Sequence, residues 1–331
     1  MRVAQQAGII GVGMSVPEMI VTNFDLEKII DTTDEWIRQR SGIVERRRAA
    51  EGQAVSDFVI EASNRALAEA YTSPEEIDLI IVATVTGDYQ TPATASIVQD
   101  GIGAVNAACF DLSAGCSGWI YALATADAFI QSGRYGKILI AGADLLSRIT
   151  NWNDRSTCVL LGDGAGAAVV QAVPEGCGVL TTLLGSDGSG SDLLKVPAGG
   201  SRRPCTSHDL QSGQNKLRMS GSEVYKFATK IIPKTIETML EDLSMTVDQI
   251  DLVIPHQANI RIIESAMKSL KLPMEKAFSN IDKYGNTSAA TIPMALCEAR
   301  AAGKIKKDDI LALVGFGAGL TWGGAIVRSL Y

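Results

Sequence analysis

The sequence is poor in the residue types that build metal and redox centres. It has only two histidines, His208 and His256, and its six cysteines include no C-x-x-C pair. A zinc site needs about four such ligands at short spacings, so neither a zinc cage nor a dithiol redox motif can be written from this chain. We therefore expect no metal, and we expect most of the cysteines to be buried thiols in a reducing compartment.

Long hydrophobic runs and an excess of basic charge are also missing. No apolar run approaches the roughly 18 residues that span a bilayer, and the first seven residues lack the features of a secretory signal. The net charge of −7 argues against a nucleic-acid-binding surface over the whole molecule. We expect a cytoplasmic protein that binds neither membrane nor nucleic acid.

The composition is that of a packed α/β protein. The chain has 331 residues, of which 46% are hydrophobic, a length that suits about two domains. Short runs rich in β-branched residues alternate with helical stretches, which predicts largely buried sheets. These predicted strands are residues 77–84, 137–141, 166–170, 250–255 and 310–314.

A faint internal repeat relates two halves of the chain. Residues 76–82 resemble 249–254, and residues 138–140 resemble 310–312, at nearly the same offset. We predict an N-terminal half over 1–174 and a C-terminal half over 175–331. A stretch over about 185–221, rich in Gly, Ser and Asp, is read as a loop excursion that forms a lid or pocket wall, with a flexible linker as the alternative.

The repeat aligns Cys116 with Asn286. Each of the two residues follows a glycine and opens a predicted helix. If a pseudo-twofold axis relates the halves, the two helix N-termini face one another across it. A thiol there gains from the helix dipole and free N–H groups, which lower its pKa. A buried structural thiol and an ordinary turn asparagine are the alternatives for each residue taken alone. Their joint placement favours a catalytic cysteine.

Four further segments bear on the chemistry. His256 directly follows a predicted strand, at the end where α/β folds place their sites, and is a candidate for acid/base or oxyanion work. His208 lies in the polar excursion and is read as a solvated residue. Residues 315–319 follow a strand and form either an oxyanion hole or a structural turn. Residues 11–16 suggest a dinucleotide fingerprint only weakly, because Val16 replaces its third glycine.

The chain also carries a set of short segments in a fixed order. They are Thr33-Asp34-Glu35-Trp36-Ile37 with Arg40-Ser41-Gly42-Ile43, Ser113 to Gly118 around Cys116, Asn153-Asp154-Arg155, Gly162 to Gly166, His256-Gln257-Ala258-Asn259, Gly285-Asn286-Thr287-Ser288, and Phe316 to Gly323. Together they resemble β-ketoacyl-ACP synthase III of bacterial type II fatty acid synthesis. The resemblance implies the α/β thiolase-like fold, in which two pseudo-symmetric βαβαβαββ halves form a five-layered α-β-α-β-α sandwich, usually as a homodimer.

The same resemblance implies an acyltransferase that starts fatty acid synthesis. Cys116 takes the acyl group from an acyl-CoA, and malonyl-ACP then loses CO₂ and condenses with it. His256 and Asn286 stabilise the thioester oxygen of the malonyl group, and the backbone N–H groups of Cys116 and Ala318 hold the second oxyanion. No cofactor is implied beyond the CoA thioester that serves as substrate.

Binding roles follow from the resemblance in the same way. It implies that CoA is bound by Trp36, Arg40, Arg155 and Asn259. The docking surface is read from charge instead. Arg261, Lys268 and Lys271 are basic residues on the predicted helix after His256 of an acidic protein, and we expect them to dock the acidic acyl carrier protein, with a solvated face as the alternative.

Two departures from the family pattern concern the pocket. Ala318 stands at the middle position of a triplet that is commonly all glycine in the family, so this chain carries an extra methyl group there. Thr91 stands where many members place a Phe that closes the acyl pocket across the dimer, so we expect room for longer or branched primers.

Two other readings stay open. One is a related Cys-His-Asn synthase of secondary metabolism, of polyketide or quinolone type. The other is a non-catalytic acyl-CoA-binding protein of the same fold, although such a protein would need none of Cys116, His256 and Asn286.

Overall fold

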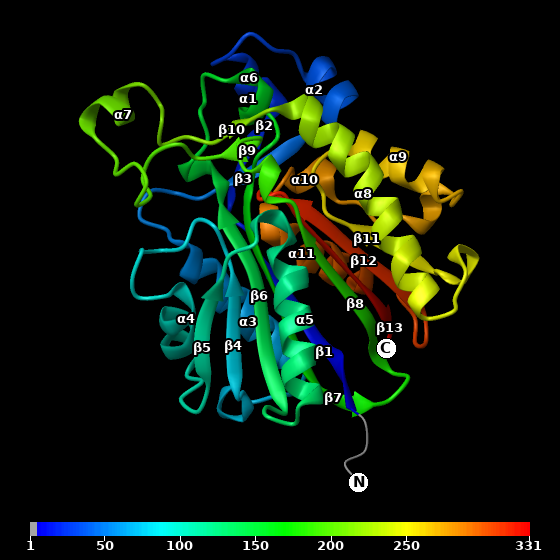
Figure 1. Ribbon diagram of the computed structural model, residues 1–331. Coiled ribbons are helices and arrows are strands. Elements are labelled where there is room, and N and C mark those ends of the chain that lie inside the picture. Colours follow the sequence, from blue (N-terminus) through cyan, green and yellow to red (C-terminus); the bar gives the residue numbers. More distant parts are fainter. Residues whose placement is uncertain (1–4) are drawn as a thin grey trace.

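Two β-sheets form the frame of the molecule, whose computed structural model describes residues 5–331 (Figure 1). The first sheet has the order β1-β7-β6-β4-β5, and the second has the order β11-β12-β13-β8. The strands are β1 Gln5–Ser15, β4 Leu79–Ala83, β5 Ala108–Leu112, β6 Lys137–Leu145, β7 Asp163–Pro174, β8 Gly178–Ser186, β11 Leu252–Pro255, β12 Ile310–Gly317 and β13 Thr321–Arg328. All five predicted strands are present.

Helices fill three layers around these sheets, which gives the expected five-layered thiolase-like sandwich. Helices α3 (Val55–Glu69) and α4 (Thr94–Ile102) cover the outer face of the first sheet. Helices α8 (Gly221–Asp242) and α9 (Ile260–Ser269) cover the outer face of the second. Helices α5 (Gly118–Gln131) and α11 (Thr291–Ala301) lie between the sheets, and their apolar residues share one buried core with strands of both. Burial of both sheets explains why the strands read as continuous apolar runs.

The two halves have the same topology with one difference. The first half follows βαβαβαββ, and β4 pairs in parallel with β5 and β6. In the second half β11 pairs in parallel with β12, but the strand that would correspond to β5 is reduced to a single bridge between Val253 and Ala277. Parallel strands bring their carboxyl ends to one edge, and that edge of each sheet carries the site.

The glycines near the N-terminus lie within strand β1 and form no nucleotide-binding turn. A Cβ at Gly11 or Gly13 would overlap the backbone oxygens of Ala66 and Ala62 on α3. These glycines therefore allow close packing of a strand against a helix, and the weak dinucleotide reading of residues 11–16 is wrong.

Short elements cover the edge of the sheets where the site lies. They are β2 Met19–Thr22, α1 Asn23–Glu27, α2 Asp34–Ser41, β3 Glu45–Arg48, α6 Arg155–Cys158 and α10 Ile281–Tyr284, with β9 Leu194–Lys195, α7 Ser207–Gln211 and β10 Arg218–Met219 in the excursion. Single 3₁₀ turns are η1 Pro74–Glu76, η2 Gly115–Ser117, η3 Leu146–Arg148, η4 Gly188–Gly190, η5 Val247–Gln249, η6 Met274–Lys276 and η7 Ser288–Ala290. Over residues 5–331, no helix combines the length and apolarity that a membrane span requires.

Candidate active site

Cys116 and Asn286 meet at the junction of the two halves. Cys116 lies in the turn η2 directly before α5, and Asn286 precedes the turn η7 and α11. The residue before each has a positive φ, 56° at Gly115 and 63° at Gly285, a conformation that favours glycine. Both side chains line the same cavities. The repeat therefore predicted correctly that these two helix starts come together.

His256 joins them from the end of β11. The residue is only 1% exposed, and it lines a cavity of about 90 Å³ together with Cys116 and Asn286. Its Nδ1 atom lies 2.7 Å from Thr291 Oγ1, and the edge of its ring meets Phe316. Burial lowers the pKa of His256 to about 3, because the charged imidazolium loses its hydration. His256 is therefore neutral at physiological pH.

The Asn286 side chain is oriented by its own turn. Its Oδ1 accepts the Ser288 backbone N–H at 2.8 Å, and its backbone N–H donates to the Leu160 carbonyl at 2.8 Å. The Nδ2 group makes no hydrogen bond to another described residue. The amide is thus fixed with a donor available to the cavity.

The thiol of Cys116 is protonated at neutral pH, contrary to the expectation of a lowered pKa. Burial raises the pKa of Cys116 to about 11; the Ser288 hydroxyl opposes this shift, and the charge of Asp144 adds to it. Loss of hydration outweighs the benefit of the helix start. The nucleophile therefore needs a base, and His256 carries the one imidazole among the described residues that line its cavity.

Asp144 is a site residue that the sequence analysis did not single out. It is fully buried at the end of β6, and its Oδ1 accepts hydrogen bonds from Val85 N at 2.8 Å and from the hydroxyls of Thr84 and Thr86. These hydrogen bonds hold the loop after β4 against the end of β6. An acidic residue at the carboxyl end of a buried parallel strand was the signal that could have revealed it.

The turn after β12 packs backbone to backbone against the nucleophile. A Cβ at Gly317 would overlap the Cys116 backbone nitrogen, and one at Gly115 would lie 2.8 Å from the Ala318 nitrogen. Thr321 Oγ1 lies 2.9 Å from the carbonyl oxygens of both Ala114 and Ala318, so its one hydrogen can go to either, and the hydroxyl lies between the two segments. Ala318 lines the cavity beside Cys116. This proximity makes residues 316–319 suitable for an oxyanion hole.

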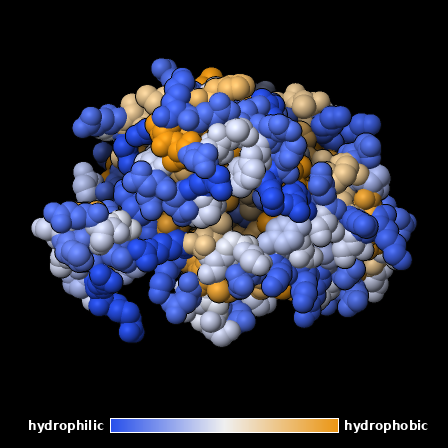
Figure 2. Space-filling view, turned by 90° about the horizontal axis from the view of Figure 1, so that it is seen from above, coloured by the Kyte–Doolittle hydropathy of each residue, from blue (hydrophilic) through white to orange (hydrophobic). Residues whose placement is uncertain are grey.

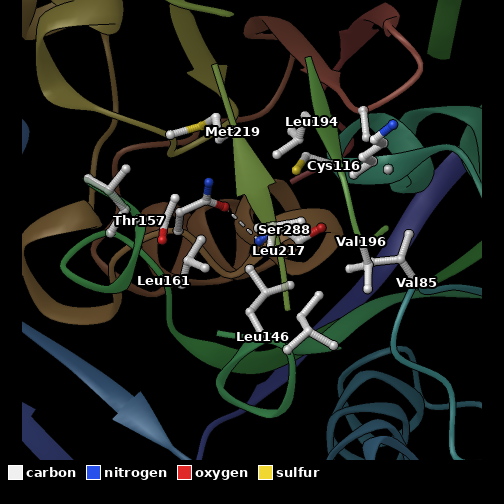
Figure 3. A pocket seen from close by; sticks show the side chains of 16 residues that line it. Val85, Cys116, Leu146, Thr157, Leu161, Leu194, Val196, Leu217, Met219 and Ser288 are labelled. Atoms are coloured by element: carbon white, nitrogen blue, oxygen red, sulfur yellow. Dashed lines mark hydrogen bonds between the residues drawn. The ribbon is translucent and has the colours of Figure 1, made fainter. Parts of the chain in front are cut away.

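An apolar cavity of about 170 Å³ extends from Cys116 (Figure 3). Figure 3 shows the cysteine at its edge and aliphatic side chains on the other sides. The excursion supplies part of this wall through Leu194, Val196, Leu217 and Met219. Thr91 is exposed and does not line the cavity of its own chain. Its predicted role concerns a partner's pocket and stays a prediction.

A surface groove of about 630 Å³ leads toward the site from the end of the molecule where α2 lies. Trp36, Arg40 and Asn259 line it, and Arg155 stacks over the Trp36 ring with its Cζ atom 4.9 Å from the centroid. Leu160 and Met219 line this groove and both cavities, so the three spaces adjoin at these two side chains. Figure 2 views this end and shows a largely hydrophilic face with apolar side chains in a hollow near its centre.

The predicted CoA residues also have structural contacts. Asn259 caps α9 through its Oδ1, which accepts Arg261 N–H, and its Nδ2 donates to the Arg40 carbonyl at 2.8 Å. The sequence analysis missed Tyr225 and Lys226 of α8, which line the groove beside Arg261. Their positions on an amphipathic helix gave no sign of this.

The basic residues near α9 are exposed, but they do not all lie on the helix. Arg261 and Lys268 lie on α9, whereas Lys271 follows its end at Ser269 and has a φ of 57°. The helix ends because Leu272 N–H donates back to the Met267 carbonyl, which places Lys271 in a left-handed turn. The prediction that Lys271 belongs to the helix is wrong.

Within the described range 5–331, no group of three His, Cys, Asp or Glu side chains could hold a metal ion.

These features define a thiolase-like α/β protein with a cysteine at the junction of two similar halves. Models of 3-oxoacyl-[acyl-carrier-protein] synthase III match residues 110–188 and, for its C-terminal part, residues 240–329. The chain is 54% identical over 322 residues to the β-ketoacyl-[acyl-carrier-protein] synthase III of Caldanaerobacter subterraneus subsp. tengcongensis, covering 97% of each. The chain therefore belongs to the β-ketoacyl-ACP synthase III family, whose members are acyltransferases.

Solved structures agree with this assignment. The synthase III of Aquifex aeolicus VF5 superposes with a TM-score of 0.90 at 45% identity, covering 97% of this chain and 99% of that one. A priming β-ketosynthase from the R1128 polyketide pathway also superposes with a TM-score of 0.90, at 33% identity, covering 100% of this chain and 98% of that one.

Proposed function

We propose that this enzyme condenses an acyl-CoA primer with malonyl-ACP, with loss of CO₂, through an acyl group carried on Cys116. The observation that carries the proposal is the meeting of Cys116, His256 and Asn286 around one cavity, from both halves of the chain. A protein that only bound acyl-CoA would need neither a nucleophile nor a base beside it.

The first half-reaction acylates the cysteine. His256 Nε2 takes the thiol proton, and the thiolate attacks the acyl-CoA carbonyl. The Cys116 and Ala318 backbone N–H groups hold the oxyanion, and CoA leaves as the thiol. The acyl chain then lies in the apolar cavity, while CoA lies in the groove between Trp36 and Asn259.

The second half-reaction forms the carbon–carbon bond. The malonyl group of malonyl-ACP loses CO₂, and the negative charge moves to its thioester oxygen. His256 Nε2–H and the Asn286 amide donate to that oxygen. The carbanion attacks the acyl-Cys116 carbonyl and expels the cysteine thiolate, which is protonated again. These steps balance with no metal or redox cofactor.

The proposal includes the surroundings of the enzyme. The six cysteines are unpaired thiols, as a reducing compartment maintains, which supports a cytoplasmic location. Strand β5 forms an open edge of the first sheet, and its residues are partly exposed. An uncovered edge strand invites pairing with a second copy, which supports a homodimer that analytical ultracentrifugation can measure.

Mass spectrometry of the intact protein tests the proposed reaction. Brief incubation with acyl-CoAs of two to twelve carbons should add an acyl group to the native protein and none to Cys116→Ala. Asn286→Ala should keep the adduct but lose about 10²- to 10³-fold in malonyl-ACP decarboxylation, because one oxyanion donor is missing. If no primer labelled Cys116, the acyl-enzyme route would be wrong. Turnover with malonyl-CoA in place of malonyl-ACP would instead favour the synthase of secondary metabolism.

The same panel tests the role of Thr91. If this small residue leaves room in the partner's pocket, primers of four to eight carbons should react at least as fast as acetyl-CoA. Thr91→Phe should then slow the longer primers and spare acetyl-CoA, because the ring fills that space. A native enzyme that strongly preferred acetyl-CoA would contradict this role.

A further inference from the structure

One buried hydroxyl lies behind His256 and has two neighbours to which it can donate. Thr291 Oγ1 lies 2.7 Å from His256 Nδ1 and 2.9 Å from the Ser288 carbonyl oxygen. A hydroxyl has one hydrogen and two lone pairs, so it donates to one neighbour at a time. The Ser288 carbonyl also accepts the Thr291 backbone N–H and therefore keeps a partner when the hydroxyl turns away.

The two positions of this hydrogen match the two tautomers of neutral His256. When the hydroxyl donates to Ser288, Oγ1 accepts the Nδ1–H of His256, and Nε2 is a bare acceptor. When the hydroxyl donates to Nδ1, the ring hydrogen is on Nε2. Thr291 is 2% exposed and provides the one hydrogen bond of the His256 ring within residues 5–331, so no other described group competes for Nδ1.

The two half-reactions of the proposed function, on which this inference rests, need opposite tautomers. Acylation needs a bare Nε2 that accepts the thiol proton, whereas decarboxylation needs an Nε2–H that donates to the thioester oxygen. We propose that Thr291 is a positioning residue that holds the His256 ring in place and serves either tautomer by turning its hydroxyl.

The protons balance over the cycle. In acylation the thiol proton moves from Sγ to Nε2, the departing CoA thiolate takes one proton from solvent, and the imidazolium gives its Nδ1 proton to solvent. The Nε2–H tautomer remains, and the Thr291 hydroxyl now donates to Nδ1. After condensation, Nε2 returns its proton to the Cys116 thiolate while Nδ1 takes one proton from water. The net uptake of one proton is that of the whole reaction.

The tautomers can be read directly because the chain has only two histidines. His208 is exposed on α7 and lines neither cavity beside Cys116, so His208→Gln leaves His256 as the one imidazole to observe. ¹⁵N NMR of the histidine-labelled protein should show a protonated Nδ1 in the free enzyme and a protonated Nε2 in the acyl-enzyme. The same tautomer in both states would overturn the proposal.

Two variants at position 291 complete the test. Thr291→Val removes the hydroxyl at nearly constant volume and should abolish the tautomer change and slow both half-reactions at least tenfold. Thr291→Ser keeps the hydroxyl and should restore both. Unchanged half-reactions in Thr291→Val would also overturn the proposal. If no acyl-CoA modified Cys116, the proposed function would fail and this inference with it, whereas an adduct with an unchanged tautomer would refute only the inference.

Discussion

At the scale of single residues, the site pairs a protonated thiol with a neutral imidazole. The pKa of Cys116 is raised to about 11 and that of His256 is lowered to about 3, so no thiolate–imidazolium pair exists between these values. Both shifts have the same cause, because a buried site disfavours either charge. The uncharged pair is therefore the resting form of the site.

This arrangement predicts the pH dependence of alkylation. The thiolate fraction of a group with a pKa near 11 rises about tenfold per pH unit below that value, so iodoacetamide should modify Cys116 about a hundredfold faster at pH 9 than at pH 7. Peptide mass spectrometry distinguishes Cys116 from exposed Cys205, and Cys116→Ala gives the background. A rate that reached its plateau near pH 7 would instead indicate an ion pair with His256.

Sequence reasoning found the residues whose positions are marked in the chain itself. Cys116 and Asn286 were matched by the repeat, and His256 by its place after a strand. Asp144 and Thr291 were missed because their roles come from contacts across the fold, with the loop after β4 and with the His256 ring. The direction of the Cys116 shift was also wrong, since burial at the junction cannot be read from one helix start.

At the scale of elements, predictions succeeded where one local signal dominates. The buried strands are continuous apolar runs, so their positions followed from the sequence. Pro273 marks the end of α9 in the sequence only to within a few residues, and the single bridge at Ala277 depends on how the chain packs after the helix.

The close approach of β12 to the nucleophile predicts a strong effect of a single methyl group. Gly317→Ala would place a Cβ against the Cys116 backbone nitrogen, so the turn must shift and displace the oxyanion donors. We expect at least a hundredfold loss of Cys116 acylation and a destabilisation of about 1–3 kcal/mol, measured by urea unfolding. Gly188→Ala is the matched control, because a Cβ there meets no atom within 4 Å. Full acylation by Gly317→Ala would show that the turn does not hold the oxyanion.

At the scale of the whole molecule, the charge is distributed unevenly. The net charge of −7 opposes the approach of an acidic carrier protein, yet Arg261 and Lys268 stand exposed on α9 and Lys226 lies beside Arg261 in the groove. Two of these residues, Arg261 and Lys226, line the groove that leads toward Cys116. A carrier protein bound there would extend its thioester arm into the groove that we propose for CoA, after CoA has left.

The basic surface on α9 therefore predicts a defect confined to the second substrate. Lys268 lies outside the groove. Lys268→Glu should therefore lower kcat/KM for malonyl-ACP about tenfold, because charge reversal mainly slows the encounter of the two proteins. The same substitution should leave acylation by acyl-CoA unchanged. Arg261→Glu should lower both, since Arg261 also lines the groove. The Lys268→Glu defect should shrink as salt shortens the Debye length from about 10 Å at 0.1 M to about 3 Å at 1 M. Lys304→Glu, an exposed site outside α9 and the groove, serves as the control. If Lys268→Glu and Lys304→Glu behaved alike, carrier docking would have to lie elsewhere on the surface.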